Sequence, residues 1–289
     1  MYVKTNGKSR SFIYKGGDRM NFLRICRYLY TKKLFGEIVL FIQLICMLEM
    51  SFVVLKPVDS YLMEKKQLKA AYVSDLDSMV HFSKNNLIYE QEMKGNRAAA
   101  QEIYKLLLEA DDVEKVDRCA FENGTYIKTD GKMSSANLVL YSSEMLDVIR
   151  LNTESAALKN VSEGYVPILV SSSMAEELPV GTRTEISLAF DDTIKISCEV
   201  AGILQRDSAV PVVFSYGDTM ELGNMAILPE ALSEYKFVVF AKDMDELFDQ
   251  LTNVNFLIEP KNNISGEKLA VSLQDRMKNY GTVNTYKTI

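Results

Sequence analysis

The stretch VPILVSSSMAEELPVGTRTEISLAFDDTIKISCEVAGIL, residues 166–204, decides the fold of the larger part of this chain. It opens with an apolar run, residues 166–170, whose length suits a buried strand. Ser173 and Glu176 have the spacing of a capping box, which predicts a short helix over residues 174–178. The stretch contains no nucleophile elbow, no set of metal ligands and no phosphate loop, so it predicts architecture and not a catalytic centre.

A turn and a β-hairpin are predicted next. Pro179 ends the short helix, and Gly181 stands where a tight turn favours glycine. Apolar and polar residues then alternate on both sides of Asp191 and Asp192, which predicts a hairpin with a turn at this pair and one apolar face. The alternating apolar residues are Ile186, Leu188, Phe190, Ile194, Ile196, Cys198 and Val200. Further short strands are expected within residues 209–229.

Two strand–helix–strand units flank this region. The first is predicted from a strand at 86–91 (NLIYEQ), a strongly amphipathic helix at 96–110 and a strand at 112–121. Ile103, Leu106, Leu107 and Ala110 form the apolar stripe of its helix.

The second unit closes the chain, with a strand at 254–260, a helix at 265–281 and a strand at 282–289. Ser265 is its expected N-cap and Gly281 its expected C-cap. The helix offers four residues for burial, namely Leu269, Val271, Leu273 and Met277.

The first strands of the two units share a pattern, NLIYE and NFLIE. We therefore predict an α+β fold in which one β-α-β subdomain, residues 86–121 and 230–289, is interrupted by an inserted, mostly-β subdomain, residues 122–229. Chance similarity between two amphipathic units is the alternative.

The N-terminal part differs sharply in charge and hydropathy from the rest. Residues 1–33 hold nine basic side chains and one acidic one, whereas residues 57–289 hold 36 acidic and 23 basic ones. Between them, residues 34–55 (LFGEIVLFIQLICMLEMSFVVL) contain no Lys, Arg or Pro and span about 33 Å as a helix, enough to cross a bilayer core of about 30 Å. Because basic residues stay on the cytoplasmic side, we expect a single-pass plasma-membrane protein with residues 1–33 cytoplasmic or interfacial and those after about 56 extracytoplasmic.

An apolar run of this length also occurs in buried helices of soluble domains and in secretory signals. A buried helix of a soluble domain does not explain the basic block that precedes the run. A secretory signal starts earlier, is shorter and ends in a small-x-small cleavage site, which is missing here. No second run of 18 apolar residues follows residue 56.

The flanks of the span carry their own predictions. Phe22, Ile25 and Leu29 have helical spacing, which suits an interfacial helix leading into the span. Glu49 either reaches the interface or is neutral there, or it contacts another transmembrane helix. Residues 56–85 are predicted as stalk and connector, with 57–68 continuing the anchor helix after a break at Pro57.

Composition and residue types exclude several functions. A net charge of −6 argues against nucleic-acid binding. His81 is the sole histidine, which excludes a Ser-His-Asp triad and a His-based metal site. NGKS at 6–9 lacks the first glycine of a phosphate loop and a preceding strand. We predict no catalytic, cofactor-binding or metal-ligating residues and no cofactor. Cys119 and Cys198 either pair or remain buried free thiols.

The order of elements resembles the extracytoplasmic core domain of the MacB and FtsX-like ABC permeases. In that family a strand is followed by Ser-x-x-hydrophobic-Ala, a short helix, a VG-T turn, a strand, and a strand ending in V-x-GI. The matching residues here are Ser171, Ala175, Val180, Gly181, Thr182, Val200, Gly202 and Ile203. The resemblance covers roughly residues 20–289, and residues 151–161 stand where the family has its lead-in to the motif.

The resemblance implies a mechanical role. It implies a cytoplasmic ABC ATPase subunit and other permease transmembrane segments as partners, in a dimeric assembly in the lipid membrane, with any ATPase activity in a partner. Family permeases carry three more transmembrane helices after this domain, so the chain is expected to be a first segment, a split permease or a single-span relative. The residues expected to matter are the turn at 179–181, the hairpin, and the stalk at 57–68. The alternative function is a single-span binding or sensing module without transport.

Overall fold

The structure is a computed structural model that describes residues 17–73, 75–84, 90–153, 160–189, 191–213, 225–251 and 254–285. The chain divides into two compact units, Met1–Tyr61 and Leu62–Ile289.

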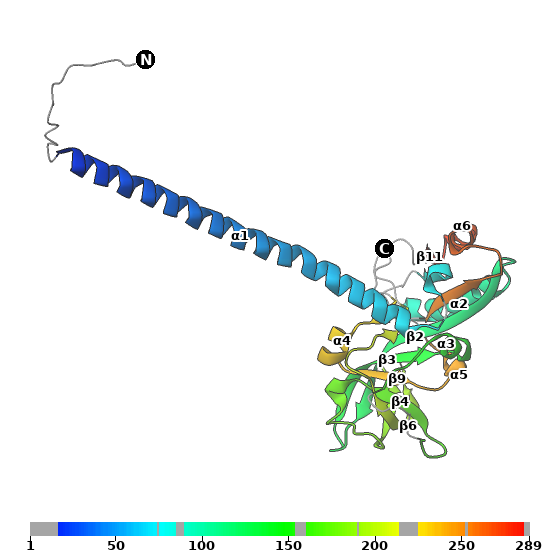
Figure 1. Ribbon diagram of the computed structural model, residues 1–289. Helices are drawn as coiled ribbons and strands as arrows, with labels where there is room; N and C mark the ends of the chain where they lie inside the picture. The colour runs from blue at the N-terminus through cyan, green and yellow to red at the C-terminus, as the bar shows by residue number, and fades with distance from the viewer. Residues whose placement is uncertain are drawn as a thin grey trace, which may run out of the picture. The chain divides into compact units, whose positions relative to one another are not determined.

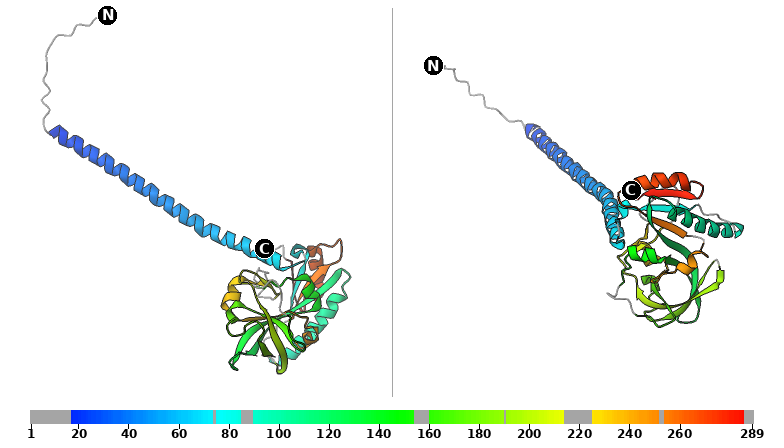
Figure 2. Two further views of the ribbon diagram at one scale, coloured as in Figure 1. Left: turned by 60° about the horizontal axis from the view of Figure 1, so that its bottom comes forward. Right: turned by 90° about the vertical axis from the view of Figure 1, so that its right-hand side faces the viewer.

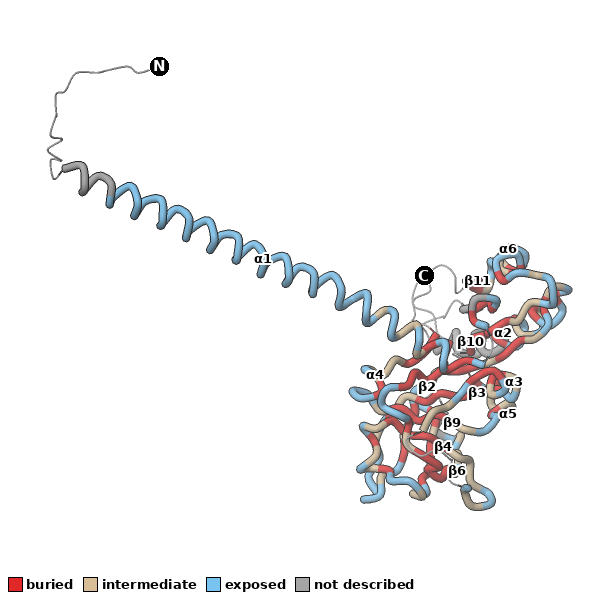
Figure 3. Tube along the Cα trace, in the orientation of Figure 1, coloured by how far each residue is buried: buried red, intermediate tan, exposed pale blue. Residues whose placement is uncertain are grey.

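Helix α1, Gly17–Ala71, is one continuous helix. Its residues 23–60 are exposed (Figure 3), and its most apolar 18-residue stretch has a mean hydropathy of 2.5. By length and composition it is long and apolar enough to cross a membrane. The predicted break at Pro57 is wrong, because the helix continues through this proline. Pro57 has no N–H for the carbonyl of Val53, a loss that helices close to or inside a membrane tolerate.

The second unit is built on a nine-stranded mixed sheet (Figure 1), in the order β11-β1-β10-β2-β3-β9-β4-β6-β5. The strands are β1 (Val80–Lys84), β2 (Val113–Ile127), β3 (Met133–Tyr141), β4 (Val166–Val170), β5 (Arg183–Leu188), β6 (Asp191–Ile203), β9 (Phe237–Phe240), β10 (Val254–Pro260) and β11 (Gly281–Thr285). The molecule is thus a mixed α+β protein with one N-terminal apolar helix and a β-rich domain.

The far part of the sheet closes on itself. β5 pairs with β6 and also with β2, at Gly124↔Leu188, Thr125↔Ser187 and Tyr126↔Ile186. The six strands β2-β3-β9-β4-β6-β5 therefore form a closed barrel. Closure depends on Gly124, since a Cβ there would lie 2.8 Å from the main-chain oxygen of Ser187.

The rest of the sheet, β11-β1-β10-β2, is covered by two helices. α2 (Glu90–Leu108) and α6 (Gly266–Met277) pack on the same face, and Figure 2 shows them at the opposite end of this unit from the barrel. All partner strands in this part are antiparallel, so β1 and β2 run parallel with β10 between them. β2 is long enough to serve both parts of the sheet.

One hydrophobic core runs through both parts. The strands alternate, so that the odd or even residues of each strand face this core and the others face the opposite side. Its members include Val80, Phe82, Ile103, Leu107, Val116, Tyr126, Leu138, Ile168, Val200, Phe240, Phe256 and Leu273. The opposite face buries Cys119, Tyr141, Val239 and Leu257.

Short elements complete this unit. They are η1 (Leu76–Ser78), α3 (Ser143–Val148), η2 (Ser172–Met174), α4 (Pro229–Glu234), α5 (Asp245–Phe248) and a two-stranded ladder of β7 (Val210–Pro211) and β8 (Ala226–Ile227). The expectation of short strands within 209–229 is met by β7 and β8, and residues 214–224 lie outside the described ones.

The predicted first unit needs correction. Among the described residues, the strand that precedes its helix is β1, at Val80–Lys84. Residues 85–89 lie outside the described ones, while Glu90 and Gln91 belong to α2. β2 also runs six residues past the predicted end at residue 121.

The second unit is closer to the prediction. β10 has the predicted bounds, and Ser265 caps α6 by accepting a hydrogen bond from the Lys268 N–H. The expected C-cap is wrong, because the helix ends at Met277 and Gly281 begins β11. Val271 is 72% exposed, whereas the other three residues expected to be buried are buried.

The opening stretch folds as β4, η2, a turn and the β5–β6 hairpin. β4 is confirmed at Val166–Val170, and Gly181 has a positive φ of 88°. The predicted helix is wrong, because residues 172–174 form a 3-10 turn without a side-chain cap. The hairpin is confirmed, but Asp191 already pairs with Leu188, so the turn lies before the predicted one.

Candidate functional site

The end of α1 is built into the unit that begins at Leu62. Two main-chain hydrogen bonds tie this end to the C-terminal end of α3 (Ser143–Val148): the Arg150 N–H donates to the Ala71 oxygen (2.7 Å), and the Val73 N–H donates to the Val148 oxygen (2.8 Å). Three side chains at this end are buried, namely Leu68, Ala71 and Tyr72. We call this attachment the junction.

Side chains extend the junction to residues far along the chain. The Tyr72 hydroxyl donates to the main-chain oxygen of Met225 (2.8 Å), and the Gln67 side-chain amide donates to that of Asp207 (2.8 Å). Helix end, α3 and the segment around β7 and β8 are thereby joined at one place on the sheet. Displacing this end would break hydrogen bonds both to α3 and the residues after it and to the segment around β7 and β8.

A buried polar cluster lies beneath the junction. The Tyr141 hydroxyl donates to the Pro211 oxygen, and the Val213 N–H donates to the Cys119 Sγ (3.1 Å). Burial raises the pKa of Cys119 to about 12 and raises the pKa values of Tyr72 and Tyr141 well above their ordinary value. These groups therefore stay neutral at physiological pH and act as hydrogen-bond partners, not as bases.

Asp117 is the charged member of this region. Its side chain is fully buried, and the Lys115 Nζ lies 3.3 Å from Oδ1. Neither carboxylate oxygen has a hydrogen bond of good geometry among the described residues. Burial raises the pKa of Asp117 to about 7, against the opposing effect of Lys115, and the nearby Glu259 and Glu144 raise it further.

His81 of β1 lies in the same row across the sheet as Asp117 of β2, and β10 runs between their two strands. Leu257 of β10 is paired with His81 on one side and with Asp117 on the other. His81 is 2% exposed, and its burial lowers its pKa to about 3, so it stays neutral. Among the described residues, no group of three His, Cys, Asp or Glu side chains is arranged to hold a metal ion.

The turn at 179–181 belongs to a second, partly exposed network around Glu177. This carboxylate lies 2.8 Å from the Lys236 Nζ and 3.0 Å from the Lys128 Nζ, and it accepts a hydrogen bond from the Tyr126 hydroxyl. The hydrogen bond from Lys236, followed by that from Tyr126, lowers the pKa of Glu177 to about 2. The network fastens the turn to β2 and to the start of β9.

Two of the three serines of the opening stretch, Ser171 and Ser173, make hydrogen bonds to a distant part of the chain. Ser171 and Ser173 both donate to the main-chain oxygen of Tyr235, at 3.1 and 2.8 Å, and the Phe237 N–H donates to the Ser171 Oγ (3.0 Å). Ser173 therefore does not cap a helix as predicted. These contacts connect η2 to the chain between α4 and β9.

The elements that the sequence analysis expected to matter do not come together in one site. The turn, the hairpin and the serines lie in the barrel, whereas the residues 62–68 of the predicted stalk lie at the junction. Cys119 and Cys198 are both buried free thiols, which settles the alternative left open by the sequence. Tyr72, Glu177 and Asp117 were missed. Four charged residues stand at 114–118 within β2, and no pattern in the sequence distinguishes the buried Asp117 from the other three.

Comparisons with known proteins give only structural matches. No protein-family model matches the sequence, and no curated protein matches it. The matching solved structures include the extracellular domain of the noncanonic ABC-type transporter YknZ from Gram-positive bacteria, with 13% identity, 72% of this chain and 98% of that chain covered, and a TM-score of 0.37. They also include the periplasmic region of MacB from Actinobacillus actinomycetemcomitans, with 10% identity, 76% and 92% covered, and a TM-score of 0.39.

Both matches are extracytoplasmic domains of ABC-type transporters, the class that residues 166–203 resemble. Both TM-scores are below 0.5, so these similarities do not assign a function to the chain.

Proposed function

We propose that this chain is the membrane-anchored part of an ABC transporter permease of the MacB and FtsX-like type. Its outer domain transmits ATP-driven motion to the export or release of a substrate such as a peptide or an antibiotic. A cytoplasmic ATPase and further permease transmembrane segments are its partners, in a dimeric assembly, and ATP hydrolysis belongs to the ATPase. This chain itself has no enzymatic role.

The junction is the observation that carries this proposal. A passive tether needs only a loose linker between its anchor and its domain. Here one side of the end of α1, Leu68 and Ala71, is buried, and this end is hydrogen-bonded to α3 and to the segment around β7 and β8. A helix held in this way moves the sheet with it, because packed interiors transmit displacement instead of absorbing it.

The proposal assigns a role to each part of the chain. Residues 1–33 are cytoplasmic or interfacial, 34–55 cross the plasma membrane, and 56–85 are stalk and connector. Residues 86–121 and 230–289, together with β1 (Val80–Lys84) and without β9 (Phe237–Phe240), form the β-α-β subdomain around the inserted strands of 122–229, with β2 serving both. The strand order β11-β1-β10-β2, in which each parallel pair has an antiparallel strand between its members, supports two split β-α-β units.

Labelling in intact cells tests the orientation. Cys119 and Cys198 are buried, so replacing Cys26 and Cys46 by Ser leaves no exposed thiol among the described residues. Asp130→Cys, whose aspartate is about half exposed in the β2–β3 turn, is expected to react with a membrane-impermeant maleimide. Lys8→Cys is expected to react only after permeabilisation. The reverse pattern contradicts the proposed orientation.

Motion is tested with the chain assembled with the ATPase and permease segments encoded at its native locus. Spin labels at Lys66→Cys, exposed on α1, are expected to report a different distance between two copies with and without ATP. A catalytically inactive ATPase is the matched control and should abolish the change. If the locus encodes no ATPase, or the distance does not respond to ATP, the transport proposal fails and a binding or sensing role remains.

A further inference from the structure

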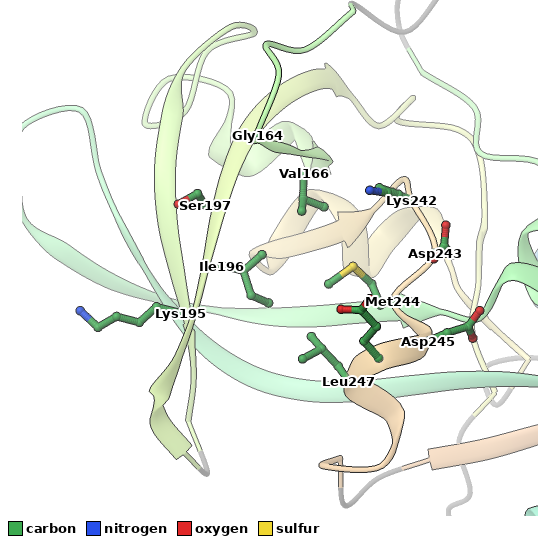
Figure 4. Close-up of a pocket in the computed structure, with 11 residues that line it drawn as sticks. Gly164, Val166, Lys195, Ile196, Ser197, Lys242, Asp243, Met244, Asp245 and Leu247 are labelled. Atoms are coloured by element: carbon green, nitrogen blue, oxygen red, sulfur yellow. The ribbon is translucent and has the colours of Figure 1, made fainter.

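A pocket of about 410 Å³ lies between the middle of β6, the start of β4 and the chain that leads into α5 (Figure 4). It belongs to neither the junction nor the Glu177 network. Three of its properties point to one kind of ligand: an apolar floor, an open strand edge and an excess of uncommitted negative charge.

The floor of the pocket is formed by apolar side chains at the edge of the hydrophobic core. Met244 is a core residue, and Val166, Ile196 and Leu247 are partly buried and pack against that core. Figure 4 shows these four side chains converging on the same space. An apolar side chain placed there would be removed from water, at a gain of about 25 cal/mol per Å² of buried apolar surface.

One wall of the pocket is a strand edge without a neighbour. β4 joins β6 only from the pair Val166↔Cys198 onward. Before Cys198, β6 is paired with β5 on one side, and on the other side it has no strand partner among the described residues.

The hydrogen-bond pattern shows which backbone groups face that open side. The Val200 N–H donates to the Thr182 oxygen and the Val200 oxygen accepts from the Gly181 N–H, so Val200 faces β5. The register to β5 is unshifted back to Lys195, and backbone groups alternate in direction along a strand. Ser197 therefore directs its N–H away from β5, towards the side on which the pocket lies.

Some of the charged side chains at the mouth of the pocket have an ion-pair partner, and others have none within the described residues. Asp245 is held by Arg118 (3.0 Å) and by the Ser143 hydroxyl (2.8 Å), and the Lys195 ammonium is paired with Glu185 and points away from the pocket (Figure 4). Asp243, Glu246 and Lys242 have no ion pair within the described part of the chain. Two free carboxylates thus face one free ammonium, which favours a positively charged ligand.

We propose that this pocket binds a short, extended, cationic peptide. One apolar side chain of the peptide enters between Ile196 and Leu247, a peptide carbonyl accepts a hydrogen bond from the Ser197 N–H, and a basic side chain reaches Asp243 and Glu246. Addition of a strand to a free edge is a recurrent mode of peptide recognition. At about 410 Å³ the pocket lies within the range of about 300–1,000 Å³ typical of small-ligand sites, which suits a few residues of a peptide.

Binding is measured by fluorescence anisotropy with the full chain in detergent, so it does not depend on the transport proposal. The probe is the fluorescein-labelled hexapeptide acetyl-KVLVKV-amide, and its acidic counterpart acetyl-EVLVEV-amide is the charge control. We expect saturable binding of the basic peptide and binding at least tenfold weaker of the acidic one. Without saturable binding of the basic peptide, or with equal binding of both peptides, the proposal is overturned.

Two variants locate the site. The double variant Asp243→Asn, Glu246→Gln should weaken binding about five- to tenfold, as expected for two rim-exposed charge pairs. Asp275→Asn, which removes an exposed charge from α6, is the matched control and should change binding less than twofold. Equal affinities for the double variant and the wild type contradict the assignment.

The strand edge is tested separately. Ser197→Pro removes the N–H that the peptide would use, at an edge position where proline is tolerated, and should weaken binding. Hydrogen exchange keeps the test decisive if this variant does not fold. Peptide binding should then slow exchange in segments 194–198 and 242–247 of the wild-type chain, and protection elsewhere without protection of these segments would refute the pocket as the site.

Discussion

The hydroxyl of Tyr72, the first residue after α1, donates a hydrogen bond to the main-chain oxygen of Met225, which lies 153 residues further along the chain. Both residues are buried. This bond links the end of the long helix to the residue before β8. Replacing Tyr72 by Phe removes the hydroxyl group, and with it this bond, while the ring stays in place.

Tyr72→Phe should therefore destabilise the unit Leu62–Ile289. The Met225 oxygen would remain buried without this donor, at a cost of about 1–2 kcal/mol in the free energy of unfolding. Thermal unfolding of the full chain in detergent, followed by near-UV circular dichroism of the tyrosines, measures the effect. The exposed Tyr235→Phe is the matched control and should be nearly neutral. An unchanged Tm in Tyr72→Phe would show that the hydrogen bond contributes little.

Asp117→Asn should stabilise the protein above neutral pH. The pKa of Asp117 is raised to about 7 by burial, so the folded chain binds a proton more tightly than the unfolded chain does. The wild type is then least stable above pH 7 and gains stability as the pH falls towards 4. At pH 8 the neutral amide avoids a buried charge and is expected to add about 1–3 kcal/mol to the free energy of unfolding.

The difference between Asp117→Asn and the wild type should shrink as the pH is lowered from 8 to 5. Urea unfolding at several pH values checks this, with Asp275→Asn as a control for the loss of an exposed carboxylate. An advantage that does not depend on pH would mean that Asp117 is not the titrating group.

Glu177→Gln should have the opposite pH signature. The pKa of Glu177 is lowered to about 2, chiefly by its hydrogen bond with Lys236, so its contribution to stability is present above about pH 4.5 and is lost as the pH falls towards 2. Its side chain is 27% exposed, and solvent screening limits the contribution to about 1–2 kcal/mol.

Unfolding of the wild type and of Glu177→Gln should therefore differ at pH 7 and converge near pH 2. Glu185→Gln is a matched control, because it breaks the more exposed pair with Lys195 in the hairpin. Equal losses in the two variants at pH 7 would show that the Glu177 network contributes no more than an ordinary surface ion pair.

Gly124→Ala should open the barrel. The added methyl group would lie 2.8 Å from the Ser187 main-chain oxygen and would also overlap the Leu138 side chain, and the main-chain oxygen cannot move without separating β5 from β2. We expect a loss of more than about 2 kcal/mol, typical of severe overpacking.

Gly202→Ala is the comparison for this variant. Its methyl group would meet only side-chain atoms, at 3.2 Å or more, which can shift by a few tenths of an ångström. Hydrogen exchange should show faster exchange in β5 for Gly124→Ala and not for Gly202→Ala. A similar loss in both variants would contradict a special role of the β2–β5 contact.

Local patterns predicted the parts of the fold that local physics controls. β4, β10, the Ser265 cap and the turn at Gly181 follow from apolar runs, capping chemistry and backbone freedom. β1 was misplaced because its inward Val80 and Phe82 alternate with the buried His81, which looks like a surface position in a sequence. The long helix was divided at Pro57 because proline is unfavourable in helices of soluble proteins, a rule that a membrane-proximal helix need not obey.

The candidate site was hidden for a different reason. Tyr72 and Met225 are joined by one hydrogen bond across 153 residues, and no periodicity or motif encodes such a pair. Closure of the barrel by β2 and β5 is equally non-local. Glu177 was visible only as part of a short helix, and its role depends on lysines from two other parts of the chain.

The shared strand has a consequence for how this domain can be divided. One edge of β2 pairs with β10 over its first half and with β5 over Gly124–Tyr126, and the other edge pairs with β3. The boundary expected between residues 121 and 122 falls inside this strand. A gene fragment ending there would leave both halves with an unpaired, aggregation-prone edge. Because β2 joins both halves, we expect the unit Leu62–Ile289 to be expressed and unfolded as one piece and not as two separate subdomains.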